Sequence, residues 1–337
     1  PGEEQPPLPV ELRLPAPDPL DPAAERATFE VPPGVHVQLV AAEPLVGDPV
    51  ALAFDGDGGL WVAEMRGYMP DVDGTGEGEP VGQVARLVDE DGDGRMDRRT
   101  VFLDGLVLPR AILPTRGGLL CIAPPELFFA RDTDGDGRAD ERQVLATGLG
   151  GLESPEHAIN GLVPGLDNWI RVANAPLRWR FVGEEAGTAF GSQAQPVHGW
   201  LQARTAGGGQ WGLCQDDDGR FFYNTNSQSL YADLVPSWYS VRNPNLGRAA
   251  GVLVRVVQDE TVRPARPTPG VNRGYRAGLL RDDGSLSVFT AACSPFLHRG
   301  AALARFRGDA FVCEPAGNLV KRFVLEERAD GRLHASD

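Results

Sequence analysis

Two acidic loops decide the fold: Asp89-Glu-Asp-Gly-Asp-Gly-Arg-Met-Asp97 and its near copy Asp132-Thr-Asp-Gly-Asp-Gly-Arg-Ala-Asp140. The sequences that follow them repeat as well, because Thr100-Val-Phe-Leu-Asp-Gly-Leu106 is echoed by Gln143-Val-Leu-Ala-Thr-Gly-Leu149. Similarity at a fixed period indicates a supersecondary unit that is built several times along the chain.

Each loop also places carboxylates at relative positions 1, 3, 5 and 9. The eight residues are Asp89, Asp91, Asp93, Asp97, Asp132, Asp134, Asp136 and Asp140. Hard oxygen ligands at this spacing resemble the first half of an EF-hand loop and predict bound calcium. Thr100 and Gln143 stand where an EF-hand has its glutamate, so Asp97 and Asp140 are the candidate replacements. The alternative is a solvated turn rich in Asp and Gly, without a metal. A calcium ion here would be structural, since both loops are expected at the periphery of the fold.

Pairs of apolar segments around a Gly, Asp or Asn turn occur five times. They span residues 49–62, 110–122, 157–170, 210–223 and 301–313, and the first four are spaced by about 50–60 residues. Each pair is expected to be the inner half of a four-stranded blade. The sequence therefore predicts an all-β protein, a β-propeller of five to six four-stranded blades. We expect Val35–Ala41 to be an outer strand that closes the ring by pairing with Asn318–Leu325.

The predicted domain organisation has two parts. Residues 1–34 are Pro-rich and form an extended N-terminal arm, and residues 35–337 form a single propeller domain. Within that domain, about residues 228–288 form a long excursion on one face, where specific functions are often located.

Composition narrows the functional classes. The formal net charge of −15 argues against nucleic acid and anionic membrane surfaces, and it suits calcium or a basic protein partner. The sequence contains no run of about 18 apolar residues, so it predicts no transmembrane segment. The Pro/Glu-rich start resembles a processed mature terminus, so we expect a periplasmic or other extracytoplasmic location, peripheral to the membrane through a partner.

The four cysteines show neither a Cys-x-x-Cys pair nor a c-type haem attachment motif, so we expect no haem on this chain. Cys293 and Cys313 fall on two apparent strands of one β-unit, where a disulfide is plausible in an oxidising compartment. Cys121 and Cys214 lie in apolar strands and are expected to be buried free thiols.

Several segments carry a family resemblance. They are residues 29–34, 39–45, 61–68, 155–162, 165–170, 270–275, 289–293 and 311–320. These segments resemble the propeller domain of the bacterial membrane-bound dehydrogenase family of planctomycete type. That family is related to soluble quinoprotein glucose and aldose sugar dehydrogenases.

The resemblance implies a catalytic site, but this sequence departs from the family pattern elsewhere. It makes His157 the counterpart of the general base that acts on a sugar hydroxyl, with Glu156 as a carboxylate to orient it. The relatives hold the quinone PQQ with an Arg-Asn pair, where this chain has Gly208-Gly-Gln-Trp-Gly-Leu213. Other members usually continue into further propeller, helical and cytochrome segments.

Three functional hypotheses follow. The favoured one is a non-catalytic assembly subunit that docks on a membrane-bound electron-transfer complex, respiratory or photosynthetic. Its partners would be cytochrome or reaction-centre-like subunits. The alternative is a PQQ- and calcium-dependent sugar or alcohol dehydrogenase with His157 as base. The third is a sugar-binding module.

Overall fold

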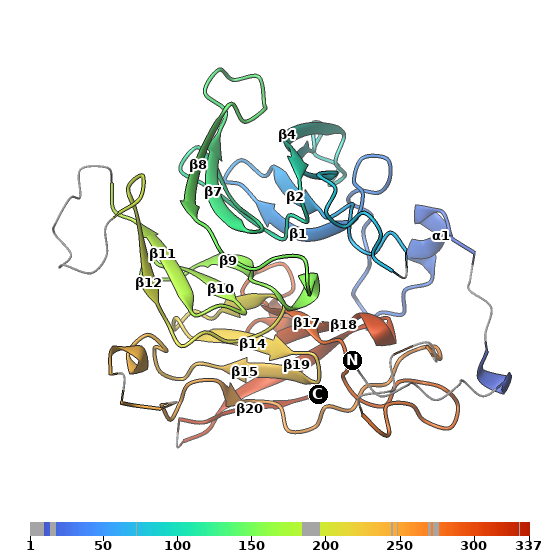
Figure 1. Ribbon diagram of the computed structural model, residues 1–337. Helices are drawn as coiled ribbons and strands as arrows, with labels where there is room; N and C mark the ends of the chain where they lie inside the picture. Colours follow the sequence, from blue (N-terminus) through green and yellow to red (C-terminus); the bar gives the residue numbers. More distant parts are fainter. Residues whose placement is uncertain are drawn as a thin grey trace. The chain divides into compact units, whose positions relative to one another are not determined.

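The computed structural model describes residues 10–13, 18–71, 73–183, 196–243, 245–247, 249–268, 271, 276–329 and 331–337. Its strands form five antiparallel sheets of four strands each (Figure 1). The all-β architecture predicted from the repeats is confirmed, and the five sheets are the blades of a β-propeller. Among the described residues, no helix is long and apolar enough to cross a membrane.

Three blades come from the first part of the chain. Blade 1 contains β1 (Pro49–Phe54), β2 (Leu60–Glu64), β3 (Gly82–Val88) and β4 (Arg98–Leu106). Blade 2 contains β5 (Ala111–Thr115), β6 (Gly118–Ala123), β7 (Glu126–Arg131) and β8 (Glu141–Ala146). Blade 3 contains β9 (Asn160–Pro164), β10 (Ile170–Ala173), β11 (Leu177–Phe181) and β12 (Trp200–Arg204).

The remaining two blades come from the second part. Blade 4 contains β13 (Leu213–Gln215), β14 (Phe221–Thr225), β15 (Gln228–Ala232) and β16 (Val254–Arg255). Blade 5 contains β17 (Cys293–Leu297), β18 (Ala310–Glu314), β19 (Leu319–Glu327) and β20 (Leu333–Ser336). Short 3-10 turns occur at Val10–Leu12, Pro155–His157, Ser240–Arg242, Ala304–Phe306 and Pro315–Gly317.

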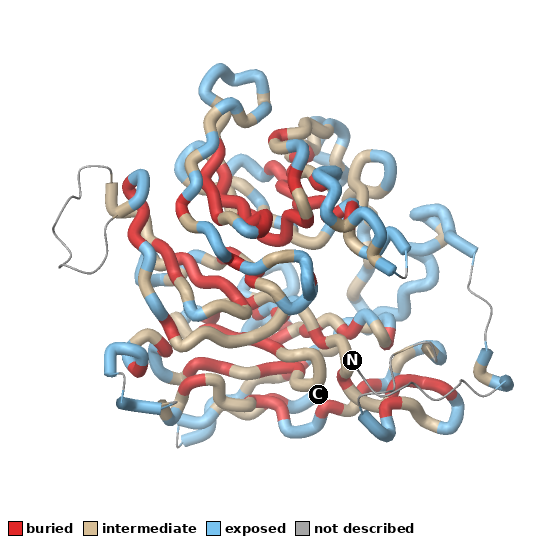
Figure 2. The backbone as a smooth tube through the Cα atoms, in the orientation of Figure 1, coloured by how far each residue is buried: buried red, intermediate tan, exposed pale blue. Residues whose placement is uncertain are grey.

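Both faces of blade 2 are buried, which explains why its central strand β6 is apolar throughout. Side chains on a strand alternate between the two faces of the sheet. On β6, Leu119 and Cys121 pack in a core with Trp61 of blade 1. Leu120 and Ile122 pack in a second core with Trp179 of blade 3. Figure 2 shows the resulting concentration of buried residues along the strands, with exposed residues in the loops.

Two compact units are formed. One comprises Leu20–Pro164 and Asn168–Ala203, with blades 1 to 3. The other comprises the described residues of Pro1–Pro19, Gly165–Asp167 and Arg204–Asp337, with blades 4 and 5. In this second unit Phe222, Leu230, Val312 and Phe323 belong to one shared core.

The predicted arm and the predicted excursion both contain regular secondary structure. Within residues 1–34 the chain forms α1 (Pro22–Ala27), capped by Asp21, whose carboxylate accepts hydrogen bonds from two backbone N–H groups. Residues 1–9 and 14–17 of the arm lie outside the described residues. The predicted excursion at 228–288 includes β15 and β16 of blade 4.

Two local expectations were wrong. Val35–Ala41 forms no strand, because its chain lies against the first acidic loop, where the Met96 N–H donates to the Val40 carbonyl. The outer neighbour of β19 is β20. In blade 5, Ala304–Phe306 is a 3-10 turn, and the strand that pairs with β18 is β17, earlier in the sequence.

Asp55 generates a prediction about the turn between β1 and β2. It accepts hydrogen bonds from Trp61 Nε1 at 2.9 Å and Arg86 Nε at 2.7 Å, and from the Asp57 and Gly59 N–H groups. Burial raises the pKa of Asp55, but these bonds outweigh burial and lower its pKa to about 2. We expect Asp55→Asn to destabilise the fold by about 1–2 kcal/mol at neutral pH, after allowance for solvent screening.

Because the folded-state pKa is depressed, this stabilisation is complete above about pH 4 and is lost as the pH falls towards 2. Unfolding free energies measured between pH 6 and pH 2 should therefore converge for the wild type and Asp55→Asn. The exposed Asp57→Asn is the control. A difference that stays constant down to pH 2 would contradict this role.

Candidate functional site

The two acidic loops have the same internal hydrogen bonds. They connect β3 to β4 and β7 to β8, at the periphery of blades 1 and 2. Asp89 accepts the N–H groups of Gly92 at 2.7 Å and Gly94 at 2.8 Å. Asp132 accepts those of Gly135 at 2.6 Å and Gly137 at 2.8 Å. All four glycines have positive φ, from 80° to 89°, so each loop needs glycine at these positions.

Carboxylates converge in both loops. Among the described residues, Asp89, Asp91 and Asp97 form one group whose oxygens lie within 4.8 Å of one another. Asp132, Asp134 and Asp136 form the other. Asp93 and Asp140 belong to neither group. Asp93 accepts the Arg95 N–H, and Asp140 accepts the Thr133 N–H. Hydrogen bonds from Gly137 and Gly135 hold the pKa of Asp132 below its usual value, which keeps it anionic.

His157 lies on the connection from β8 to β9, in the 3-10 turn Pro155–His157. Its Nδ1 is 3.0 Å from Ser154 Oγ and 3.5 Å from Glu156 Oε1. The carboxylate proposed from the sequence therefore does lie beside the imidazole. Both side chains are about half exposed, at 46% for His157 and 49% for Glu156.

Sequence reasoning missed two neighbours of Glu156. Tyr68, on the connection between β2 and β3, donates from its hydroxyl to Glu156 Oε2 at 3.3 Å. Burial and then the charge of Glu156 raise the pKa of Tyr68 to about 12. Arg110 is 1% exposed and donates from Nη1 to the Pro155 carbonyl at 3.1 Å. Its Nη2 has no hydrogen-bond partner among the described residues. Nothing in the spacing of Tyr68, Arg110 and Glu156 along the chain would have connected them.

The place expected for a quinone-holding Arg-Asn pair carries an amide pair. Gln210 Nε2 donates to Asn226 Oδ1 at 2.5 Å, and the Asn226 backbone N–H donates to Gln210 Oε1 at 2.9 Å. Both polar ends of the Gln210 side chain are therefore engaged within the protein. These residues do not fit a quinone as an Arg-Asn pair would, because neither supplies a positive charge for its carboxylates.

Cys293 and Cys313 face each other across the ladder between β17 and β18 and are free thiols in this structure. Their interaction raises the pKa of Cys293 and lowers that of Cys313 to about 7. The pairing geometry suits the disulfide expected from sequence, which stays a prediction. Burial raises the pKa of Cys121 and of Cys214 to about 12, as expected for inert thiols.

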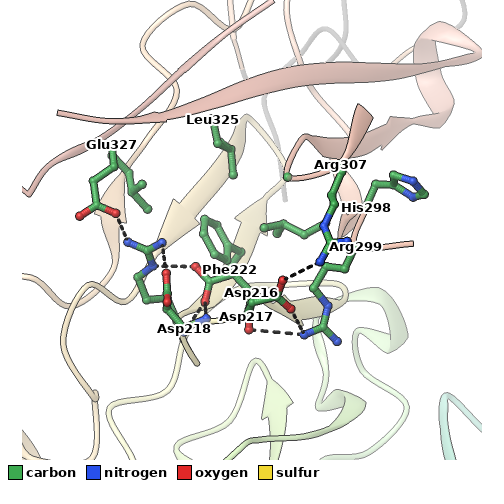
Figure 3. A pocket seen from close by; sticks show the side chains of 13 residues that line it. Asp216, Asp217, Asp218, Phe222, His298, Arg299, Arg307, Leu325 and Glu327 are labelled. Atoms are coloured by element: carbon green, nitrogen blue, oxygen red, sulfur yellow. Dashed lines mark hydrogen bonds and ion pairs between the residues drawn. The ribbon is translucent and has the colours of Figure 1, made fainter. Parts of the chain in front are cut away.

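A charged cavity of about 410 Å³ lies in the unit of blades 4 and 5 and was not anticipated from sequence (Figure 3). Its lining comes from the turn between β13 and β14, the connection between β17 and β18, and the strands β14, β17, β19 and β20. The charged lining residues are Asp216, Asp217, Asp218, Arg220, Arg299, Arg307 and Glu327, besides His298. The run Asp216-Asp-Asp218 is visible in the sequence, but its cationic partners are too distant along the chain to be inferred.

The connection between β15 and β16, residues 233–253, lies within the excursion that the sequence predicts at about residues 228–288, but the surface it presents was not anticipated. Its base is fixed by the Leu234 N–H, which donates to the Gly251 carbonyl at 2.7 Å, and by Asp233, which accepts the Leu253 N–H at 2.9 Å. Trp238 stacks on Tyr239 with 4.3 Å between ring centroids. Among its described residues the loop nevertheless exposes four large apolar side chains: Val235, Tyr239, Val241 and Leu246.

Solved structures similar to this chain include three dehydrogenases of low identity. A Thermus thermophilus protein described as a putative oxidoreductase (glucose dehydrogenase) shares 16% identity, over 86% of this chain and 83% of that one, with a TM-score of 0.46. The PQQ-bound aldose sugar dehydrogenase of Streptomyces coelicolor shares 13% identity, over 89% and 84%, with a TM-score of 0.46. The PQQ domain of pyranose dehydrogenase from Coprinopsis cinerea shares 12%, over 88% and 82%, with a TM-score of 0.42.

No curated protein matches the sequence. A family model described as a domain of unknown function, DUF7133, matches residues 21–336, which include all five blades. The chain therefore belongs to the DUF7133 family.

Proposed function

We propose that this propeller is a non-catalytic interaction subunit of a membrane-bound electron-transfer complex, respiratory or photosynthetic, and that it docks through residues 233–253. The observation that carries the proposal is the exposed apolar surface of that loop. Tyr239 is 60% exposed and Leu246 is 50% exposed, although the loop is anchored at its base. A fixed loop that presents aromatic and aliphatic side chains to solvent is typical of a protein-binding surface.

Charge supports a protein partner of basic character. The formal net charge of −15 would speed association with a cationic surface and would repel anionic lipid and nucleic acid. A basic face on a cytochrome or reaction-centre-like subunit would meet this requirement. An extracytoplasmic, periplasmic location is part of this proposal, as is membership in the membrane-bound dehydrogenase family of planctomycete type that the sequence resembles.

The second candidate is a PQQ-dependent sugar or alcohol dehydrogenase, which the arrangement of Tyr68, Glu156 and His157 favours. A half-exposed imidazole beside a carboxylate has the composition of a general base. The buried Arg110 supplies a cation with an unpartnered N–H group nearby. Against this candidate stands the Gln210–Asn226 pair, which supplies no positive charge for the carboxylates of a quinone. A sugar-binding module would use the same polar residues without chemistry.

Calcium has a structural role in this proposal. Each acidic loop offers three converging carboxylates, and glycine-rich backbone that can present carbonyl oxygens. An ion in each loop would relieve the repulsion between these carboxylates and stiffen the outer turns of blades 1 and 2.

The docking proposal predicts the effect of removing the apolar loop surface. The double substitution Tyr239→Ser and Leu246→Ser should reduce the affinity for membranes of the source organism about tenfold or more, because central apolar anchors dominate interface energies. Co-sedimentation at several salt concentrations measures this affinity. Leu166→Ser, at a similarly exposed side chain on another loop, is the control. Equal retention of both variants and the wild type would contradict the assignment.

The non-catalytic proposal predicts the outcome of reconstitution with PQQ and calcium. Dye reduction with a panel of sugars and alcohols should stay at the background rate of the protein without quinone. Substrate-dependent dye reduction that His157→Ala abolishes would overturn the proposal and establish the dehydrogenase instead. Saturable binding of a sugar without turnover would favour the sugar-binding module.

The calcium proposal predicts a rise in the melting temperature with Ca²⁺, because an ion that binds only the folded state stabilises it. Asp91→Asn combined with Asp134→Asn should remove most of that rise. These two residues are suitable because each accepts only a single long backbone hydrogen bond, at 3.1 Å and 3.2 Å. Asp71→Asn, in another acidic turn, is the control. A rise that survives the double substitution would place the calcium elsewhere.

A further inference from the structure

The cavity in the unit of blades 4 and 5 has two sides of opposite character (Figure 3). On one side, three carboxylates share one guanidinium. Arg220 donates from Nε to Asp216 at 2.6 Å, from Nη2 to Asp218 at 2.9 Å and from Nη1 to Glu327 at 2.8 Å. This side therefore has an excess of negative charge.

On the other side, two guanidiniums share one carboxylate. Arg299 lies 3.2 Å from Asp217 Oδ1, and Arg307 lies 3.8 Å from Asp217 Oδ2. The Asp217 side chain is 65% exposed, so these two ion pairs are long, solvated and weak. Because each guanidinium has five N–H donors, Arg299 and Arg307 can also donate to a carboxylate from solution.

Apolar side chains lie between the two charged sides. Phe222 and Leu297 are buried, and Leu325 and Leu333 are partly buried. Figure 3 shows Phe222 and Leu325 between Glu327 and the Arg299–Arg307 pair, while the His298 ring points away from that space. The volume of about 410 Å³ lies in the lower part of the range, about 300–1,000 Å³, of small-molecule sites.

We propose that this cavity binds an amphipathic zwitterion: a free α-amino acid with an apolar side chain. The ligand carboxylate binds Arg299 and Arg307. The ligand ammonium binds Asp218 and Glu327, which are more exposed than Asp216 and retain acceptor sites beyond their bonds to Arg220. The ligand side chain contacts Leu325 and Phe222. A simple anion or a simple cation would satisfy only one of the two sides.

The test compares three ligands of the same shape by calorimetry: leucine, 4-methylpentanoate, which lacks the ammonium, and isopentylamine, which lacks the carboxylate. Leucine should bind at least about tenfold more tightly than either analogue, because each analogue loses a charge-assisted interaction. No binding of leucine at millimolar concentration, or equal binding of either analogue, would overturn the proposal. The latter outcome would make the cavity a site for anions or for cations alone.

Two variants test which side of the cavity binds the ligand ammonium and which binds the ligand carboxylate. Glu327→Gln should weaken leucine about tenfold and leave 4-methylpentanoate unchanged, whereas Arg307→Gln should weaken leucine and 4-methylpentanoate alike. Both side chains are more than half exposed, so the fold should tolerate these changes, which a melting curve checks. Glu326→Gln is the matched control, because adjacent strand residues point to opposite faces. A loss of leucine binding in Glu326→Gln equal to that in Glu327→Gln would contradict the site.

Discussion

The rest of the structure depends on how the two faces of each four-stranded sheet are covered. A sheet with two apolar faces is stable only between two other layers. On one face of blade 1, Leu60 and Val62 pack against the segment that contains Val40 and Leu45. Blade 2 meets this constraint with adjacent residues, since Leu119 packs towards blade 1 and Leu120 towards blade 3. The acidic loops, His157 and the loop at residues 233–253 all lie on connections between strands.

Much of the fold could be predicted because its signals are local. The Gly and Asp turns at Asp55–Gly59 and Asp216–Arg220 lie between apolar strands, and the duplicated acidic loops report the repeat directly. The strand predictions were wrong where contacts with distant residues determine the backbone conformation of an apolar segment. Val35–Ala41 alternates like a strand, yet its backbone is fixed against an acidic loop. The strand that begins blade 5 contains Pro295, and Ser294 has a φ of 51°, features that argue against a strand in sequence alone.

The sites were less predictable than the fold. Glu156 and His157 are adjacent in sequence, and their proximity required no tertiary information. Tyr68 contacts Glu156 and Arg110 contacts Pro155 from other parts of the chain, and no repeat in the sequence predicts these contacts. The charge pattern of the cavity joins residues from 216 to 327, and the exposure of Tyr239 depends on how its loop is anchored. Such features come from tertiary packing, which composition and spacing do not encode.

We propose that the function of this propeller resides in a docking surface at residues 233–253. Hydrogen exchange of the backbone amides, measured with and without membranes of the source organism, tests it most directly. We expect slowed exchange in residues 233–253 on binding, and unchanged exchange around Tyr68, Arg110 and His157. Protection at Tyr68, Arg110 and His157, with none at 233–253, would contradict the account.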